Sequence, residues 1–353
     1  MNITINKAKE SLDKLIKKSR IHFYKPIQIA EILYHDRVFH DVDLSLLETF
    51  RTQSKKWRDE ICITLLGRVC TSSSRFQDNL FDKNAIPPTI LKVLGQYNRK
   101  TGGAIEAYIY QCFADRHSQL KQALEYCMTS EAKKFDVKKF IDSFRYEAGL
   151  KRSLDKVYEI VVYALFSALA EVLNLQVTIS VDNSKFNIVS EFKDFAEKVM
   201  RLNPSVISQS EPAKIYRAGI TNAADRGIDI YSNWGAVIQV KHLTLDEELA
   251  EDITNGISSD RVIIVCKDTD KNIILSLLTQ IGWQSHIQSI ITERDLTLWY
   301  EKALRGRYSK LTGDKVISYL RNEIKSEFPS TEDMPEALKL RNYEDISDSI
   351  FMS

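Results

Sequence analysis

Hydrophobic and polar positions divide the chain into a mostly helical first part and a second part that mixes helices with strands. Over residues 1–150 we expect helices near residues 4–19, 26–34, 43–70, 87–97, 103–128 and 136–147. Pro26 and the Pro87-Pro88 pair open two of these helices, as proline does in a first helical turn. Residues 71–84 are expected to form a connector, and residues 98–103 a flexible basic loop.

The pattern changes after Gly149. An apolar helix is expected over residues 153–173, a strand over 175–181, a further helix over 184–201 and a loop over 202–215. A hairpin at 226–242 and a helix over 246–255 follow, then a continuous apolar run at 261–266, typical of a buried central strand, and a helix near 270–281. This order predicts an α/β sandwich built on a mixed sheet.

The hairpin carries the most informative group of polar residues. Its first arm alternates apolar and polar residues, and the Asn and Gly between the arms are turn formers. In the second arm Gln239 and Lys241 project from the same face, because they are two residues apart. A short turn would place Asp229 opposite or diagonal to Gln239. A carboxylate, an amide and an ammonium would then converge, and such a patch can hold a divalent cation next to a phosphate.

This chemistry suits hydrolysis of a phosphodiester. Asp229 is the first choice as a ligand of Mg²⁺, which prefers oxygen atoms. Gln239 offers only a neutral carbonyl oxygen, so a second negative charge is missing. Lys241 would position or deprotonate the attacking water and offset the charge of the phosphate. Asp225 is an alternative first acid, although a loop residue at the entry to the strand explains it as well.

Two segments resemble known nucleases. The spelling Asp-x-Gly-x-Asp at residues 225–229, followed by Gln-x-Lys at 239–241, resembles the PD-(D/E)xK catalytic core in its Mrr-type variant, in which Gln replaces Glu. The segment from Lys18 to Tyr34 resembles the start of the HaeII-like type II restriction endonucleases, whose members have a similar length. The resemblance implies an α/β fold with a PD-(D/E)xK nuclease core, a mixed β-sheet flanked by helices, preceded by a mainly helical N-terminal domain.

The resemblance also implies an activity and its partners. These are Mg²⁺ as cofactor, cleavage of double-stranded DNA at a short GC-rich palindrome with 5′-phosphate and 3′-hydroxyl ends, a homodimer with one active site per strand, and a methyltransferase that protects host DNA. In related nucleases an acid on the helix before the first strand often points into the site. By this resemblance Glu159 would be a further catalytic residue and metal ligand, the alternative being a carboxylate on the helix surface.

Composition limits the class of protein. The 353-residue chain is 44% hydrophobic, lacks the ~18 uninterrupted apolar residues of a membrane span and has no apolar signal-peptide core. We therefore expect a cytoplasmic protein, bacterial by the resemblance, with no membrane partner. Its five cysteines show no C-x-x-C spacing, and we interpret them as reduced thiols.

Charge is distributed unevenly, although the net charge is only +1. Residues 1–150 hold 25 Lys+Arg and 18 Asp+Glu, whereas residues 151–353 hold 24 and 30. We expect a basic DNA-binding domain over 1–150, a catalytic domain over 151–325 and a loosely attached acidic tail over 326–353. The candidate phosphate contacts are Arg51, Lys55, Lys56, Arg58, Arg75, Arg217 and Arg226. A solvated helix face is the alternative for the cluster at 51–58.

Two other functions are compatible with the same residues. The core would also serve a Mrr-like or repair nuclease, with the helical part reading altered DNA. The Gln at position 239 also keeps open a non-catalytic DNA-binding protein built on a decayed nuclease fold.

Overall fold

The structure, a computed structural model, describes residues 3–69, 79–83, 85–147, 149–218, 228–241, 259, 261–267, 287–328, 339, 341–346 and 348–351. The chain forms two compact units. The first consists of Met1–Thr129, Lys139–Leu154 and Ile324–Ser353, and the second of Ser130–Lys138 and Asp155–Glu323. Residues 324–353, which include the expected tail, are thus part of the first unit.

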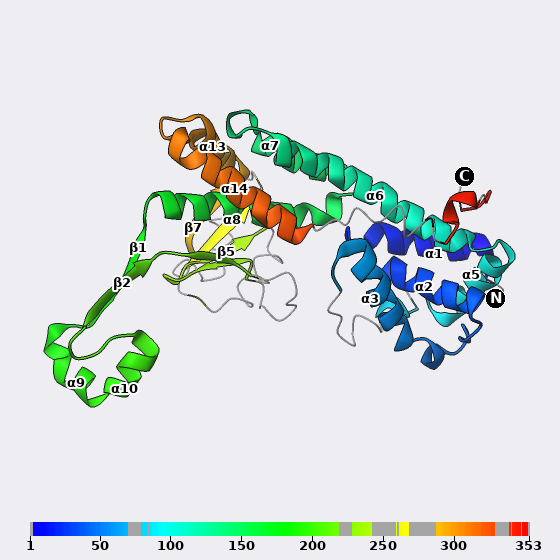
Figure 1. Ribbon diagram of the computed structural model, residues 1–353, viewed down its shortest axis with the longest axis horizontal. Coiled ribbons are helices and arrows are strands. Elements are labelled where there is room, and N and C mark those ends of the chain that lie inside the picture. Colours follow the sequence, from blue (N-terminus) through cyan, green and yellow to red (C-terminus); the bar gives the residue numbers. More distant parts are fainter. Residues whose placement is uncertain are drawn as a thin grey trace, which may run out of the picture. The chain divides into compact units, whose positions relative to one another are not determined.

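The first unit is built from helices (Figure 1). They are α1 (Ile5–Lys18), α2 (Tyr24–Val38), α3 (Gln53–Leu66), α5 (Pro88–Lys100), α6 (Ala104–Thr129) and most of α7 (Val137–Tyr146). The helices expected near 4–19, 26–34, 87–97, 103–128 and 136–147 are confirmed. The single helix expected over 43–70 is wrong, because a 3₁₀ turn at Leu47–Thr49 and the fully buried Phe50 precede α3.

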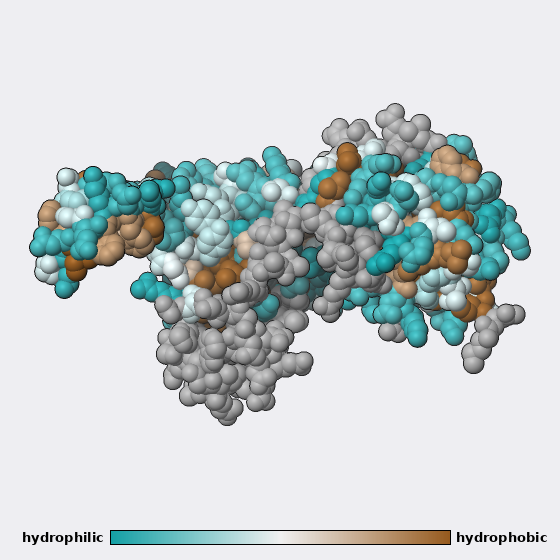
Figure 2. Space-filling view, turned by 90° about the horizontal axis from the view of Figure 1, so that it is seen from below, coloured by the Kyte–Doolittle hydropathy of each residue, from teal (hydrophilic) through white to brown (hydrophobic). Residues whose placement is uncertain are grey.

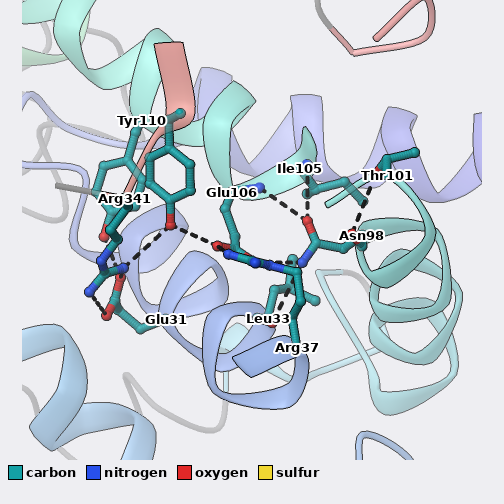
Figure 3. Close-up of polar contacts among 10 residues, drawn as sticks. Glu31, Leu33, Arg37, Asn98, Thr101, Ile105, Glu106, Tyr110 and Arg341 are labelled. Carbon is teal, nitrogen blue, oxygen red and sulfur yellow. Dashed lines mark hydrogen bonds and ion pairs between the residues drawn. The ribbon is translucent and has the colours of Figure 1, made fainter. Parts of the chain in front are cut away.

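A network of buried polar side chains connects α2, α5 and α6 (Figure 3). Asn98 is fully buried and accepts hydrogen bonds from the backbone N–H of Ile105 (3.1 Å) and Glu106 (3.4 Å) at the start of α6. Its amide donates to the Glu106 carboxylate at 2.6 Å, and Arg37 of α2 donates to the same carboxylate twice at 2.8 Å. The flexible loop expected over 98–103 is therefore wrong, because α5 continues to Lys100 and Asn98 satisfies the first N–H groups of α6.

The segment after residue 338 is attached to the same network. Arg341 donates to the two carboxylate oxygens of Glu31 at 2.7 and 3.0 Å, and the Tyr343 hydroxyl donates to Glu106 at 2.7 Å. Phe351 is buried as well. The expected loose attachment is therefore wrong for residues 341–346 and 348–351. The acidic composition did not indicate this attachment, to which one of the acids, Asp348, itself contributes by accepting from the Tyr97 hydroxyl at 2.8 Å.

The second unit contains a five-stranded mixed sheet in the order β3-β4-β5-β6-β7. The strands are β3 (Ile215–Arg217), β4 (Ile230–Ser232), β5 (Val237–Val240), β6 (Val262–Cys266) and β7 (Ile287–Thr292). β3, β4 and β5 pair antiparallel, and β6 pairs in parallel with β5 and β7. The expected mixed sheet and its central strand at 261–266 are confirmed. The helices expected at 246–255 and 270–281 lie outside the described residues.

Three helices accompany this sheet: α8 (Leu154–Val172), α13 (Glu293–Arg305) and α14 (Ser309–Glu327) (Figure 1). The Tyr300 hydroxyl of α13 donates to the backbone oxygen of Val161 in α8 at 2.8 Å. The Tyr158 hydroxyl of α8 donates to the Glu293 carboxylate of α13 at 3.1 Å. Because these bonds are buried and join two helices, they fix the position of α8, the helix that carries Glu159.

Residues 173–214, here called the arm, connect α8 to β3 and belong to the second unit. Its stem is an antiparallel pair of strands, β1 (Gln176–Ser180) and β2 (Ser208–Pro212). Its tip consists of a 3₁₀ turn (Asn183–Lys185), α9 (Phe186–Glu191), α10 (Lys193–Phe195) and a π turn (Ala196–Met200). Figure 2 shows apolar side chains gathered on one side of the tip.

The arm differs from the expectation in three ways. The strand expected at 175–181 exists, but among the strands that the structure describes it pairs with β2 and not with the main sheet. The helix expected over 184–201 is broken into short turns, and the loop expected over 202–215 contains β2. Alternation of apolar and polar residues reports a strand but carries no information on which sheet that strand joins.

Two further expectations concern thiols and membranes. Cys62, Cys112, Cys127 and Cys266 are not joined in disulfides, and Cys70 lies outside the described residues. Among the helices that the structure describes, none is long and apolar enough to cross a bilayer.

Replacing Arg341 with Met tests the attachment of the C-terminal segment. The change removes the guanidinium from Glu31, whose side chain is only 4% exposed. A buried carboxylate without its partner is costly, so we expect the free energy of unfolding of the first unit to fall by about 3 kcal/mol, measured by urea unfolding of the full chain. Lys134→Met is the control, because Lys134 pairs with Glu131 in solvent. Equal losses in the two variants would contradict a stabilising role for Arg341.

Candidate active site

The hairpin that carries the candidate residues is the antiparallel pair β4 and β5. Ile230 lies opposite Ile238 in their register. Between the strands, Gly235 adopts a φ of +89°, a conformation that glycine enters without steric strain. Continuing this register brings Asp229, one residue before β4, level with Gln239 of β5.

Asp229 and Gln239 are in direct contact. The Gln239 side-chain amide donates from Nε2 to Asp229 Oδ2 at 2.8 Å, and the backbone N–H of Val240 donates to the same oxygen at 2.8 Å. The expected convergence of these two side chains is confirmed. Both bonds end on Oδ2, so the second carboxylate oxygen, Oδ1, takes part in neither.

The carbonyl oxygen of the Gln239 side chain is the unusual atom of the pair. Gln239 is 1% exposed, and its Oε1 has no hydrogen-bond partner within the described part of the chain. A buried acceptor without a partner costs about 1–3 kcal/mol. Such an atom therefore indicates a bound water or ion as its partner.

Lys241 follows β5 and acts on Asp229 through its charge. Its backbone N–H donates to the Val265 oxygen of β6 at 2.8 Å, which fixes its position at the end of the strand. Burial raises the pKa of the Asp229 carboxyl, whereas the Val240 N–H and the charges of Lys241 and Lys156 act to lower it. The charge of Lys241 therefore favours the ionised carboxylate that a cation would require.

Glu159 of α8 belongs to the same electrostatic environment. Its side chain is buried, and both of its carboxylate oxygens lie 2.8 Å from the Lys156 ammonium. Burial raises the pKa of Glu159 to about 7, with the charge of Lys156 opposing the shift and that of Asp229 adding to it. Glu159 is thus a buried acid that senses the charge of Asp229, and its placement on the helix surface is excluded.

Arg217 has a different position from the one expected. Its side chain is 6% exposed, with Nε 2.8 Å from the Glu323 carboxylate and Nη1 3.8 Å from that of Glu159. The predicted phosphate contact is therefore wrong for this arrangement, because the guanidinium is buried between two carboxylates. Sequence reasoning also missed Lys156, although a lysine three residues before Glu159 on a helix lies on the same face.

The remaining candidate phosphate contacts divide by burial. Arg58 is fully buried and donates to Asp59 Oδ1 at 2.9 and 2.6 Å, so its expected contact with DNA is wrong for this arrangement. Lys56 is exposed, and Arg51 and Lys55 are partly exposed, so all three present charge at the surface of the first unit. Arg75, Arg226 and the alternative acid Asp225 lie outside the described residues.

Comparison with known proteins identifies the family over nearly the whole length of the chain. The family model described as HaeII restriction endonuclease matches residues 8–343. The chain belongs to this family. The type II restriction enzyme HaeII of Haemophilus aegyptius is 55% identical over 328 residues, 93% of each chain. The type II restriction enzyme NgoBI of Neisseria gonorrhoeae is 54% identical over 340 residues, 96% of each chain. No solved structure shows a significant match.

Membership of the HaeII family confirms two expectations, the family itself and the enzyme class, a type II restriction endonuclease. The 8–343 match includes the helical first part, the arm and the hairpin, so these regions belong to one enzyme architecture. Restriction endonucleases of type II generally use a divalent metal ion.

The donor atoms of this HaeII-family site fit a hard divalent cation. In the described ranges no three His, Cys, Asp or Glu side chains come close enough to hold a metal ion by themselves. Asp229 and the Gln239 carbonyl offer oxygen atoms of the kind that a hard cation prefers, and Mg²⁺ commonly binds through one or two carboxylates while it retains several waters. The unbonded Oε1 of Gln239 is the observation that favours this fit.

Lys156→Met tests the electrostatic link between Lys156 and Glu159. The Glu159 pKa rises from 4.5 to about 7 on folding, so wild-type stability decreases as pH increases between these values and is constant above them. Without Lys156 the pKa increases further and the decrease extends to higher pH. We expect a loss of about 2 kcal/mol at pH 8 and a much smaller loss at pH 5.5, measured by urea unfolding. Adding Glu159→Gln should abolish the difference between the two pH values, and its persistence would contradict the link.

Proposed function

We propose that this chain is a Mg²⁺-dependent type II restriction endonuclease that cleaves double-stranded DNA at a short, GC-rich palindromic site. The proposal rests on the Asp229–Gln239 contact of 2.8 Å and on the buried carbonyl oxygen that it leaves unbonded, in a chain of the HaeII family. Cleavage of both strands of a symmetric site is most simply done by two copies, one active site per strand. The enzyme would act in the bacterial cytoplasm, where a methyltransferase protects the host DNA.

Three oxygen donors would hold the cation: Asp229, Gln239 and Glu159. A bound Mg²⁺ supplies Lewis-acid stabilisation of charge on the phosphate. The Gln239 amide donates to Asp229 Oδ2 and so holds the carboxylate in one orientation. Glu159 supplies the second negative charge, which a glutamine lacks. Its ion pair with Lys156 offsets the free-energy cost of burying that charge.

Lys241 acts on both the attacking water and the phosphate. As an ammonium it positions the water in line with the scissile bond and offsets the charge that develops on the phosphate, and as a neutral amine it would instead take the proton of that water. The attack breaks the bond between phosphorus and the 3′ oxygen, so the products are a 5′-phosphate and a 3′-hydroxyl.

Asp229→Asn and Lys241→Ala test these roles. We expect each variant to cleave unmodified plasmid about 10³-fold more slowly in Mg²⁺, because the first loses a ligand charge and the second the group next to the water. Both should bind DNA in Ca²⁺ with wild-type affinity in a fluorescence anisotropy titration. Glu301→Gln is the control, because Glu301 pairs with Arg305 at an exposed position of α13.

The same plasmid assay separates the proposal from its alternatives. Discrete fragments from unmodified DNA support a restriction endonuclease. Cleavage confined to modified DNA would favour a Mrr-like enzyme, and DNA binding by a wild type that never cleaves would favour a non-catalytic protein.

Arg51, Lys55 and Lys56 are proposed to contact phosphates through the exposed surface of the first unit. Phosphate contacts release counterions, so the logarithm of the binding constant falls linearly with the logarithm of salt concentration. We expect Lys55→Ala combined with Lys56→Ala to reduce this slope by about 2, roughly 1 per contact, with no change in the sequence that is cut. Lys134→Ala should leave the slope unchanged. An unaltered slope in the double variant would place the DNA elsewhere.

A further inference from the structure

The tip of the arm exposes an unusual amount of apolar surface. Phe192 and Phe195 are 56% and 55% exposed, Ile188 53% and Val199 65%. Single exposed apolar residues are common on proteins, whereas a contiguous group marks a surface that another molecule covers. Figure 2 shows apolar side chains gathered at the end of the arm and bordered by hydrophilic ones.

The apolar residues surround a groove of about 520 Å³. Its walls include Val181, Ile188, Val189, Phe192, Phe195 and Met200, and Lys185 is the one charged residue among the eight that line it. Phe192 and Phe195 thus form the walls of the groove and also protrude into solvent. A surface that offers both a cavity and the side chains to fill one can pair with itself about a two-fold axis.

The size of this surface suits an interface. A phenylalanine side chain presents roughly 150–250 Å², so the two half-exposed rings contribute about 200 Å² together. With Phe186, Ile188 and Val199 the exposed apolar area of the tip reaches roughly 500 Å², before any polar rim is counted. A standard interface buries about 800 Å² on each partner.

The charge of the arm argues for one kind of occupant. Residues 173–214 contain five basic and five acidic residues, so the arm has no net charge. A surface for DNA or for an anionic membrane requires an excess of Lys and Arg, which the arm lacks. A balanced surface does not repel a second copy of itself, and exposed pairs such as Lys198–Asp194 surround the groove with both signs.

We propose that the tip of the arm is the surface through which two copies of this chain associate, with the apolar side chains of each tip covering the groove of the other. The choice of a second copy rests in part on the proposed function, because two active sites related by a two-fold axis are the simplest way to cut both strands of a palindrome. The apolar groove and the charge balance support the association independently of any activity.

Sedimentation equilibrium of the full chain tests the proposal. We expect wild type to have the mass of two chains at micromolar concentration. Phe192→Glu combined with Phe195→Glu should raise the dissociation constant at least ~100-fold, because four charges would enter an apolar contact. Phe39→Glu is the matched control, since Phe39 is 56% exposed outside the arm, and it should leave the dissociation constant unchanged. Val199→Glu, at the most exposed of these tip positions, should also weaken association and keeps the test valid if the double variant misfolds.

The outcomes are distinct. A monomeric wild type overturns the proposal, and so does a tip variant that keeps its thermal unfolding midpoint and remains as dimeric as wild type. Plasmid cleavage is measured on the same samples. If wild type fails to cut DNA although the tip variants still dissociate, the proposed function is wrong and the association surface stands. If wild type cuts DNA and the tip variants stay dimeric, the association surface is wrong and the proposed function stands.

Discussion

The hydrogen bond between the Gln239 amide and the Asp229 carboxylate sets the character of the hairpin. A glutamate at position 239 would place two like charges opposite each other on neighbouring strands, which destabilises the pair unless a cation lies between them. The amide donates to Asp229 at 2.8 Å instead, so β4 and β5 close without help from a cation. The Oε1 of the same amide has no hydrogen-bond partner among the residues that the structure describes. The glutamine therefore separates the folding of the hairpin from the binding of a ligand.

Charge around this bond is balanced through several elements of the second unit. Glu159 faces Lys156 on its own helix and Arg217 on β3, and Arg217 also binds Glu323 of α14. Each of these groups is mostly buried, so removal of one would leave another without compensation. The buried Glu159 carboxylate is thus held between two cations, one on α8 and one on β3. Charge interactions thus link α8, the edge strand β3 and the hairpin, although these elements are far apart in sequence.

The sequence predicted the hairpin because its determinants are local. Alternation, turn formers and the two-residue spacing all lie within residues 226–242, and the contact between Asp229 and Gln239 follows from the register. Asn98 and Arg217 were misplaced for the opposite reason, since their partners Glu106 and Glu323 lie 8 and 106 residues away. Arg58 pairs with the neighbouring Asp59 but also donates to Gln28, which is 30 residues away. A charged or amide residue in isolation reads as a surface group, and only its distant partner reveals that it is buried. The separate sheet of β1 was missed because alternation does not identify a pairing partner.

The arm and the hairpin are mechanically linked at one residue. The Asn233 side chain accepts from the Lys214 N–H at 2.8 Å and donates to the Pro212 oxygen at 3.1 Å, so the hairpin turn is bonded to the end of the arm. Only two residues separate β2 from β3. β3 in turn pairs with β4, which begins directly after Asp229. Because the connection is so short, the stem of the arm can move little relative to the Asp229 carboxylate. Contact between two tips would therefore constrain the separation of two hairpins, and a fixed separation is what a nuclease needs to place one cut on each strand at a defined offset.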